Sequence, residues 1–421
     1  GLLTLRGAWD RVRESAVLKF MVVAITAYGM ATFEGPMLSL KSVNAISHFT
    51  DWTIAHVHVG ALGWNGLLTF GMLYYLIPKL FGTKLYSEKL ANTHFWLATL
   101  GIIFYALPMY WAGLVQFGMW RQFTPEGFLA YPNFLETVTQ LKPLYALRSF
   151  GGALYLAGVF VMLYNIVKTV KAGSFIGDEP AEAPALTKEY APHAGEGWHR
   201  WIERRPIQML LFSLIIISIG GLIEIVPTFL IKSNIPTLAS VKPYTPLELQ
   251  GRDIYIREGC NNCHSQMIRP FRFETERYGE YSKAGEFVYD HPFLWGSKRT
   301  GPDLHRIGMK YPDSWHYTHM LDPESMSAGT NMPAYPWLHT SELDTASTPA
   351  KINAMRTIGV PYPEGYDKIA NADLSYQAAQ IVKSLEKDKI QALPNTEIIA
   401  LIAYLQRLGT DIKAETTQAK N

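Results

Sequence analysis

Apolar residues are distributed unevenly along the chain. Long apolar runs fill most of the first 170 positions and one more lies at 208–231, whereas residues 240–421 have the mixed composition of a soluble domain. About 20 residues of helix are needed to cross a hydrocarbon core that is roughly 30 Å thick. The stretches that reach this length lie at 17–38, 51–78, 92–118, 144–167 and 208–231. The pattern predicts an all-α membrane protein with a soluble tail.

The last run gives the clearest membrane signal. It reads QMLLFSLIIISIGGLIEIVPTFLI and carries a single charged residue, Glu224. A helix that is apolar on every face suits lipid better than the core of a soluble protein. We therefore predict a transmembrane anchor over 207–235.

Lysine and arginine are concentrated in alternate loops, and loops rich in these residues stay in the cytoplasm. The basic segments are the amino-terminal segment, 79–89 and 168–205, whereas 39–50 and 119–143 hold only Lys41, Arg121 and Lys142. Five crossings with this alternation place everything from Pro236 onward on the outer side. The predicted organisation is transmembrane helices over 1–170, a cytoplasmic linker over 171–206, the anchor over 207–235 and an exported domain over 236–421.

The net charge of +2 gives no indication of nucleic-acid binding. The linker is polar and contains Pro180, Pro184 and Pro192. No cleavable signal peptide is visible, and the sequence starts at Gly1 where a methionine would be expected. We therefore expect that further sequence precedes Gly1.

The two cysteines of the chain lie in one motif. Cys260, Cys263 and His264 form C-x-x-C-H, the attachment pattern of c-type haem. Two thiols one helical turn apart can reach the two vinyl groups of one porphyrin, and the adjacent histidine then lies beneath the iron. The alternatives are a structural disulfide, a dithiol redox pair or half of a zinc site. Zinc would need two further ligands, and a redox pair gives no reason for the histidine.

An electron-transfer cytochrome c usually takes a methionine as the sixth ligand. The downstream candidates are Met309, Met320, Met326 and Met332. We select Met332, because a Met-Pro in a polar loop can lean over the haem with its backbone fixed by the proline; Met326 is the rival. The periodic segment 395–409 would form a closing helix that packs on the helix before Cys260, as in a cytochrome c fold.

Two histidines, His56 and His58, lie in the apolar segment DWTIAHVHVGALGWNG. Residues two apart on an α-helix are rotated by about 200° and face nearly opposite sides. The two histidines therefore cannot share one metal, but each could hold a haem on its own side of the helix. The alternative is a pair of hydrogen-bonded polar residues inside the bundle.

The segment YGMATFEGPMLSLKSVNAISHFTDWTIAHVHVGALGWNG strongly resembles the late helices of the catalytic subunit of the cbb-type, or C-family, haem-copper cytochrome c oxidases. Residues from about 207 to 421 resemble the membrane-anchored mono-haem cytochrome c subunit of the same enzyme. The two subunits are usually separate polypeptides, and here they look fused through the linker.

The resemblance implies a role for each residue that matches the family pattern. His56 would be the proximal ligand of the high-spin haem b, where oxygen is reduced, and His58 one of the two axial ligands of the low-spin haem b. Tyr28 and Glu34 match positions that the family associates with proton movement near the active site; the alternative for both is packing or hydrogen bonding.

The sequence departs from the family at the copper site. Three histidines hold the family's copper, two of them adjacent and one linked to a tyrosine, and this sequence has no adjacent histidines. We expect His48 at an outer helix edge and His94 near the inner end of its helix, where neither completes a copper site. The copper ligands and the second low-spin haem ligand are therefore expected upstream of Gly1.

These observations predict a terminal respiratory oxidase in the bacterial inner membrane, with its cytochrome c domain in the periplasm. Electrons would pass from haem c to the low-spin haem b and on to the high-spin haem b and copper, and oxygen reduction would be coupled to proton translocation. The implied partners are other oxidase subunits, including a further cytochrome c subunit, and a soluble or membrane cytochrome c donor. The alternatives are a cytochrome c-dependent nitric oxide reductase and a membrane-anchored electron-transfer cytochrome without oxygen chemistry.

Overall fold

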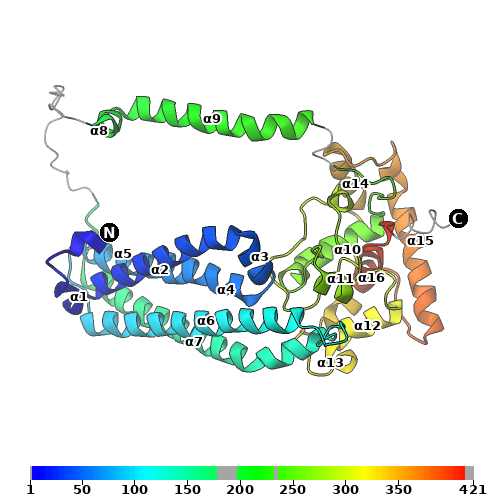
Figure 1. Ribbon diagram of the computed structural model, residues 1–421, viewed down its shortest axis with the longest axis horizontal. Helices are drawn as coiled ribbons and strands as arrows, with labels where there is room; N and C mark the ends of the chain where they lie inside the picture. The colour runs from blue at the N-terminus through cyan, green and yellow to red at the C-terminus, as the bar shows by residue number, and fades with distance from the viewer. Residues whose placement is uncertain (1, 178–196, 232–235, 413–421) are drawn as a thin grey trace.

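The computed structural model describes residues 2–177, 197–231 and 236–412 (Figure 1). Within these ranges the chain is helical, with isolated β-bridges and no extended strand. The predicted all-α class is therefore confirmed. Most of the predicted 171–206 linker lies outside the described residues.

The amino-terminal part forms a bundle of long helices. Its elements are η1 (Leu2–Leu5), α1 (Arg11–Glu14), α2 (Ala16–Ser39), α3 (Lys41–Ser47), α4 (Asp51–His58), η2 (Val59–Gly66), α5 (Leu67–Leu80), α6 (Glu88–Arg121) and α7 (Phe134–Ala172). Phe20, Leu67, Tyr74 and Phe95 are buried between α2, α5 and α6, and they form the main apolar core of the bundle.

The carboxy-terminal part begins with a short helix and the anchor. Its elements are α8 (Trp198–Glu203), α9 (Pro206–Leu230), α10 (Pro246–Arg257), η4 (Cys260–Asn262), α11 (Arg272–Tyr278), η5 (Ala284–Phe287), α12 (Asp313–Leu321), α13 (Pro323–Met326), η6 (Pro336–His339), α14 (Thr348–Thr357), α15 (Tyr366–Lys387) and α16 (Glu397–Arg407).

Four helices among the described residues are long and apolar enough to cross a membrane: α2, α6, α7 and α9. The crossing predicted at 51–78 is also helical from Asp51 to Leu80, but it is divided into α4, the π-helix η2 and α5, each too short alone. A π segment widens the turn and shifts the side chains that follow it to a new face. The anchor α9 lies apart from the bundle (Figure 1), and none of its described side chains is buried.

Helices α6 and α7 run side by side, and their backbones come close at two glycines. A Cβ at Gly151 would lie 2.6 Å from the Gly101 carbonyl oxygen, and one at Gly101 would lie 2.8 Å from the Gly151 oxygen. Small residues of this kind let membrane helices approach each other closely.

The predicted closing helix is α16, and it packs against α10 as expected. The contact is tight, because a Cβ at Gly251 would lie 1.9 Å from the Ala400 carbonyl oxygen. Tyr255 and Tyr404 meet edge to face in the core between the two helices. Sequence analysis did not anticipate α14 and α15, a helix pair between the Met332 loop and α16.

The carboxy-terminal domain lies against one end of the bundle (Figure 1). That end carries α3 and the α6–α7 loop; Arg277 of α11 donates to the Tyr131 and Pro132 carbonyls of this loop at 2.6 and 2.8 Å. Both segments belong to the loops predicted to lie on the same side as the tail. These two loops and the tail therefore lie at the same end of the bundle.

Candidate haem-binding sites

The C-x-x-C-H motif follows directly after α10. Gly259 adopts φ +72°, a left-handed conformation that turns the chain out of the helix; η4 then begins at Cys260, and Cys263 follows directly after it. Cys260 is half-buried beside the core, Cys263 is exposed, and neither forms a disulfide. Both thiols are therefore free for thioether bonds to a porphyrin.

The backbone of the 301–302 turn orients His264. Its Nδ1 donates to the Pro302 carbonyl oxygen at 2.8 Å, which leaves Nε2 as the unprotonated nitrogen. Gly301 makes this approach possible, because a Cβ there would lie 2.3 Å from Cε1 of the ring. Burial lowers the pKa of His264, although the Pro302 hydrogen bond opposes this, so the imidazole stays neutral. A neutral, fixed imidazole fits an axial haem ligand.

The methionine candidates differ in their surroundings. Met332 is half-buried and packs against the same core cluster as Cys260, together with Leu304 and Tyr335. Met326 is exposed at the end of α13, and Met309 is 73% exposed. Met320 is buried within the core itself. These positions favour Met332 as the methionine that could reach a haem bound at Cys260.

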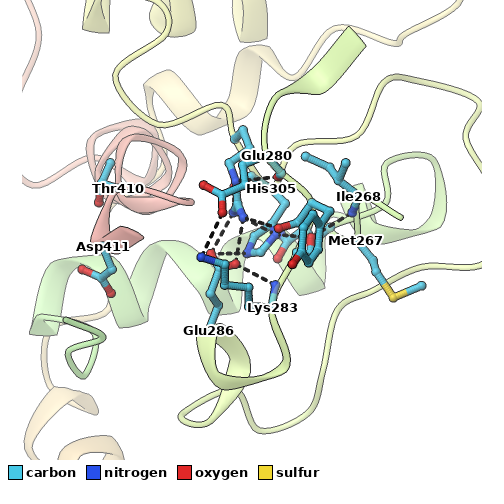
Figure 2. A network of polar contacts seen from close by, with 12 residues as sticks. Met267, Ile268, Glu280, Lys283, Glu286, His305, Thr410 and Asp411 are labelled. Carbon is cyan, nitrogen blue, oxygen red and sulfur yellow. Dashed lines mark hydrogen bonds and ion pairs between the residues drawn. The ribbon is translucent and has the colours of Figure 1, made fainter. Parts of the chain in front are cut away.

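A network of polar contacts joins residues 282–286 to His305 and Arg306, which follow the 301–302 turn (Figure 2). Glu286 accepts two hydrogen bonds from Arg306, at 2.7 and 2.8 Å, and one from the Lys283 backbone at 2.8 Å. His305 lies beside it, with Nε2 3.5 Å from Glu286 and Nδ1 2.5 Å from the Ser282 hydroxyl. The sequence did not indicate this network, because the contacts of His305 and Arg306 with Ser282 and Glu286 span 19 to 23 positions and no local pattern connects them.

In the membrane module His56 meets Glu34. His56 Nδ1 lies 3.1 Å from Glu34 Oε2, and the same oxygen accepts the Tyr110 hydroxyl at 2.7 Å. The Trp52 indole donates to the other carboxylate oxygen. With Nδ1 held by a carboxylate, His56 Nε2 is left available for a metal, the arrangement common among histidine ligands. Glu34, which the resemblance places near the active site, thus contacts His56 directly.

His58 contacts a different helix. Its Nδ1 donates to the Ile54 carbonyl oxygen at 2.8 Å, so Nε2 is unprotonated and accepts the hydroxyl of Tyr105 from α6 at 3.0 Å. An iron would take this same lone pair. His56 thus contacts a residue of α2 and His58 a residue of α6, so the two rings have different partners.

Tyr28 does not join this group. Its ring packs on Trp64 with centroids 4.5 Å apart, and the side chain is 42% exposed. His48 lies beyond α3 at the outer end of the bundle, and His94 is buried in α6 with Nδ1 3.0 Å from the Tyr74 hydroxyl. No cluster of three or more His, Cys, Asp or Glu that could hold a metal ion occurs among the described residues.

The fold and these sites define a membrane-bound haem protein of the haem-copper oxidase class. Residues 199–412 match the family described as cytochrome c oxidase, mono-heme subunit/FixO, and residues 1–154 match cytochrome c and quinol oxidase polypeptide I. The chain belongs to the mono-haem cytochrome c oxidase subunit family, and it joins this domain to helices of oxidase polypeptide I. The predicted fusion is therefore confirmed.

Curated oxidase subunits match less than half of the chain. Cytochrome c oxidase subunit 1 of Rhodobacter capsulatus is 55% identical over 171 residues, which are 40% of this chain and 32% of the relative. The subunit 1 homolog of Agrobacterium tumefaciens is 52% identical over 191 residues, 44% and 35% of the two chains. The cbb3-type subunit CcoN1 of Stutzerimonas stutzeri is 47% identical over 189 residues, 45% and 39%.

A nitric oxide reductase polypeptide, also from Stutzerimonas stutzeri, is more distant. It is 30% identical over 160 residues, which are 37% of this chain and 33% of the relative. The chain spans about a third of the length of the curated oxidase relatives that it matches.

Proposed function

We propose that this chain works in a cbb-type cytochrome c oxidase, supplying both the haem c domain and the helix that carries ligands of two b-type haems. The observation that carries the proposal is the combination of His264, oriented as an axial ligand beside two free thiols, with His56 and His58 on opposite faces of α4. Covalent haem c would be held by Cys260 and Cys263, with His264 and Met332 as axial ligands.

The haems, when bound, supply the electron transfer and the oxygen chemistry. The residues of the chain hold and orient them. Glu34 fixes the His56 imidazole and places a negative charge behind it, Ile54 fixes the tautomer of His58, and Pro302 fixes that of His264. His56 would serve the high-spin haem b and His58 the low-spin haem b.

The copper of the proposed oxidase does not fit the residues present. The sequence contains no adjacent histidines, so the copper ligands would come from outside these 421 residues. The enzyme would lie in the bacterial inner membrane with residues 236–421 in the periplasm, and it would work with further oxidase subunits and a cytochrome c donor.

The nitric oxide reductase alternative is weaker, because that relative shares 30% identity against 47–55% for the oxidases. The second alternative, an electron-transfer cytochrome, would have no open haem. A carbon monoxide difference spectrum of the purified holoprotein separates this second alternative from the oxidase, because only an iron with a free coordination position binds the gas.

Histidine variants extend this test. His56→Ala should abolish carbon monoxide binding and leave the low-spin haem spectrum intact. His58→Ala should remove the low-spin spectrum and leave carbon monoxide binding, because only the low-spin iron needs two protein ligands. Haem content is measured in parallel to separate ligand loss from failed assembly. If both variants lose the same spectral component, the two-haem assignment is wrong.

A further inference from the structure

Phe49 lies between α3 and α4, where the bundle meets the cytochrome domain. Its side chain has 0% exposure, and its backbone adopts φ +69°, a conformation unfavourable for a bulky residue. Such a conformation persists only where the surroundings hold it in place. The Phe49 ring stacks on the neighbouring His48, with centroids 4.0 Å apart, and also contacts the cytochrome domain.

Two arginines of that domain enclose the phenyl ring. The guanidinium carbon of Arg299 lies 4.2 Å from the ring centroid and that of Arg269 lies 5.3 Å from it, both within cation–π range. The backbone N–H of Arg299 also donates to the Phe49 carbonyl oxygen at 2.8 Å. Arg269 reaches further, to the Asn44 and Ala45 carbonyls of α3 at 3.3 and 3.4 Å.

Buried carboxylates hold the arginines in place. Glu274 accepts from Arg269 Nε at 2.5 Å and from Arg299 Nη2 at 3.0 Å, and Asp303 lies 3.5 Å from Arg299 Nη2. Arg299 is 2% exposed and Glu274 1% exposed. Because two positive and two negative side chains face one another, the cluster is neutral overall and can be buried.

The cluster is connected to the haem c ligand. Arg299 Nε donates to the Ser265 hydroxyl at 2.8 Å, and Ser265 follows His264 directly. Asp303, which also binds the Ser265 hydroxyl at 2.5 Å, follows Pro302, whose carbonyl orients His264. A shift of the arginines would therefore be transmitted to the haem c site.

On the other side, Phe49 is connected to the b-type haem ligands. Thr50 caps α4, and Asp51 is fixed by Gln116 of α6, which accepts from the Asp51 backbone at 2.6 Å and donates to its carboxylate at 3.0 Å. His56 and His58 follow seven and nine residues after Phe49, roughly 10 to 14 Å along the helix axis. Phe49 is thus the fixed base of the helix that carries both ligands.

We propose that Phe49, held between Arg269 and Arg299, is the positioning residue that sets the separation of the haem c site from the haem b sites. This inference rests on the proposed function. In the step it serves, ferrous haem c is oxidised as ferric low-spin haem b is reduced by the same single electron. Transfer of this kind slows steeply as the gap widens, so loosening the contact slows transfer while both haems stay bound.

Rim contacts provide a matched control. Arg272 of α11 donates to the Gly127 carbonyl oxygen at 2.6 Å, but its side chain is 64% exposed and also binds Glu276. Exposed rim contacts contribute little compared with buried central ones. Arg272→Gln should therefore leave the docking intact.

The test uses the assembled holoprotein with cysteines at Thr53 and Ser297, where the Thr53 hydroxyl donates to the Ser297 carbonyl across the interface at 3.3 Å. A short bis-maleimide linker should join them in high yield in the parent and in Arg272→Gln, and in at least five-fold lower yield in Phe49→Ala. Because this yield involves no oxygen chemistry, it tests the docking even if the proposed function fails.

The second readout is the rate of electron equilibration between haem c and haem b after photolysis of the carbon monoxide adduct. Phe49→Ala should slow this equilibration at least ten-fold with unchanged haem content, whereas Phe49→Tyr should keep the parent rate. Cross-links formed beforehand should restore the parent rate in Phe49→Ala. An unchanged cross-link yield and rate in Phe49→Ala would overturn the proposal. So would loss of haem b that the cross-link does not rescue, since Phe49 would then be needed only to fold α4.

Discussion

At the scale of single residues, the hydrogen bond made by Nδ1 of each histidine leaves its Nε2 available to bind iron. His56, His58 and His264 each have Nδ1 committed to an oxygen of a carboxylate or a carbonyl group. In every case Nε2 is the nitrogen left for iron. Glu34 stands apart among these partners because it is the one that carries a charge.

Glu34→Gln is expected to retain the high-spin haem but to change its reduction potential. The amide can still hold the imidazole, whereas the negative charge that makes His56 a stronger donor is lost. We expect the reduction potential of the high-spin haem to rise and activity to fall about 10- to 100-fold. Redox titration of the holoprotein measures this, with Tyr28→Phe as a control that should leave the potential unchanged.

Met332→Ala is expected to remove the sulfur ligand of haem c. The weak sulfur-to-iron band near the red end of the oxidised spectrum should vanish and the potential should fall, because methionine ligation raises it. Met326→Ala, at an exposed position, serves as the comparison. Loss of the band in Met326→Ala alone would assign the ligand to that residue.

At the scale of helices, two backbone features shape the membrane module. The π-helix η2 begins immediately after His58, so the face that α4 presents to the haem sites differs from the face that α5 packs in the core. The close crossing of α6 and α7 at Gly101 and Gly151 fixes Tyr105, since a Cβ at Gly151 would also lie 2.6 Å from the Tyr105 backbone nitrogen. Tyr105 in turn contacts His58.

Gly151→Val should therefore disturb the His58 site through the helix crossing. Overpacking of this kind costs about 1–3 kcal/mol. We expect a lower melting temperature and a reduced ratio of haem b to haem c in the purified protein. Gly152→Val is the matched control, because nothing lies within 4 Å of a Cβ at Gly152. Equal effects of the two substitutions would argue against a specific crossing.

At the scale of the whole molecule, the docking of the cytochrome domain on the bundle includes a titratable group. The pKa of His48 is lowered from 6.5 to about 4, mainly by burial and then by the Arg269 and Arg299 guanidiniums, while Glu274 opposes them. In a separated state His48 would titrate near 6.5. Below that pH the separated state takes up a proton that the docked state excludes until about pH 4.

The docked state should accordingly be favoured most above about pH 6.5. The equilibrium constant for docking should fall by roughly ten-fold between pH 6.5 and 5. Spin labels on cysteines placed at Thr53 and Ser297 can follow this, because their distance distribution should broaden at pH 5 in the intact protein. His48→Asn removes the titrating ring and should flatten the dependence. A parent protein whose distances stay constant from pH 7.5 to 5 would contradict it.

The sequence alone determined those features that rest on local spacing. Apolar run length predicted the membrane helices, the spacing of Cys260, Cys263 and His264 predicted a haem c motif, and the two-residue spacing of His56 and His58 predicted opposite faces. Each depends on residues within about one turn or one helix of each other, where geometry follows from the chain itself. The helical segment 395–409 was predictable for the same reason, through its periodicity.

Tertiary structure decided what those residues contact. Glu34 beside His56, Tyr105 beside His58, and Pro302 beside His264 join positions 22 to 47 residues apart. Packing also decided three further features: the surroundings that distinguish Met332 from Met326, the helix pair α14–α15, and the enclosure of Phe49 by two arginines. Such contacts depend on how separate helices approach one another, and local spacing does not encode that approach.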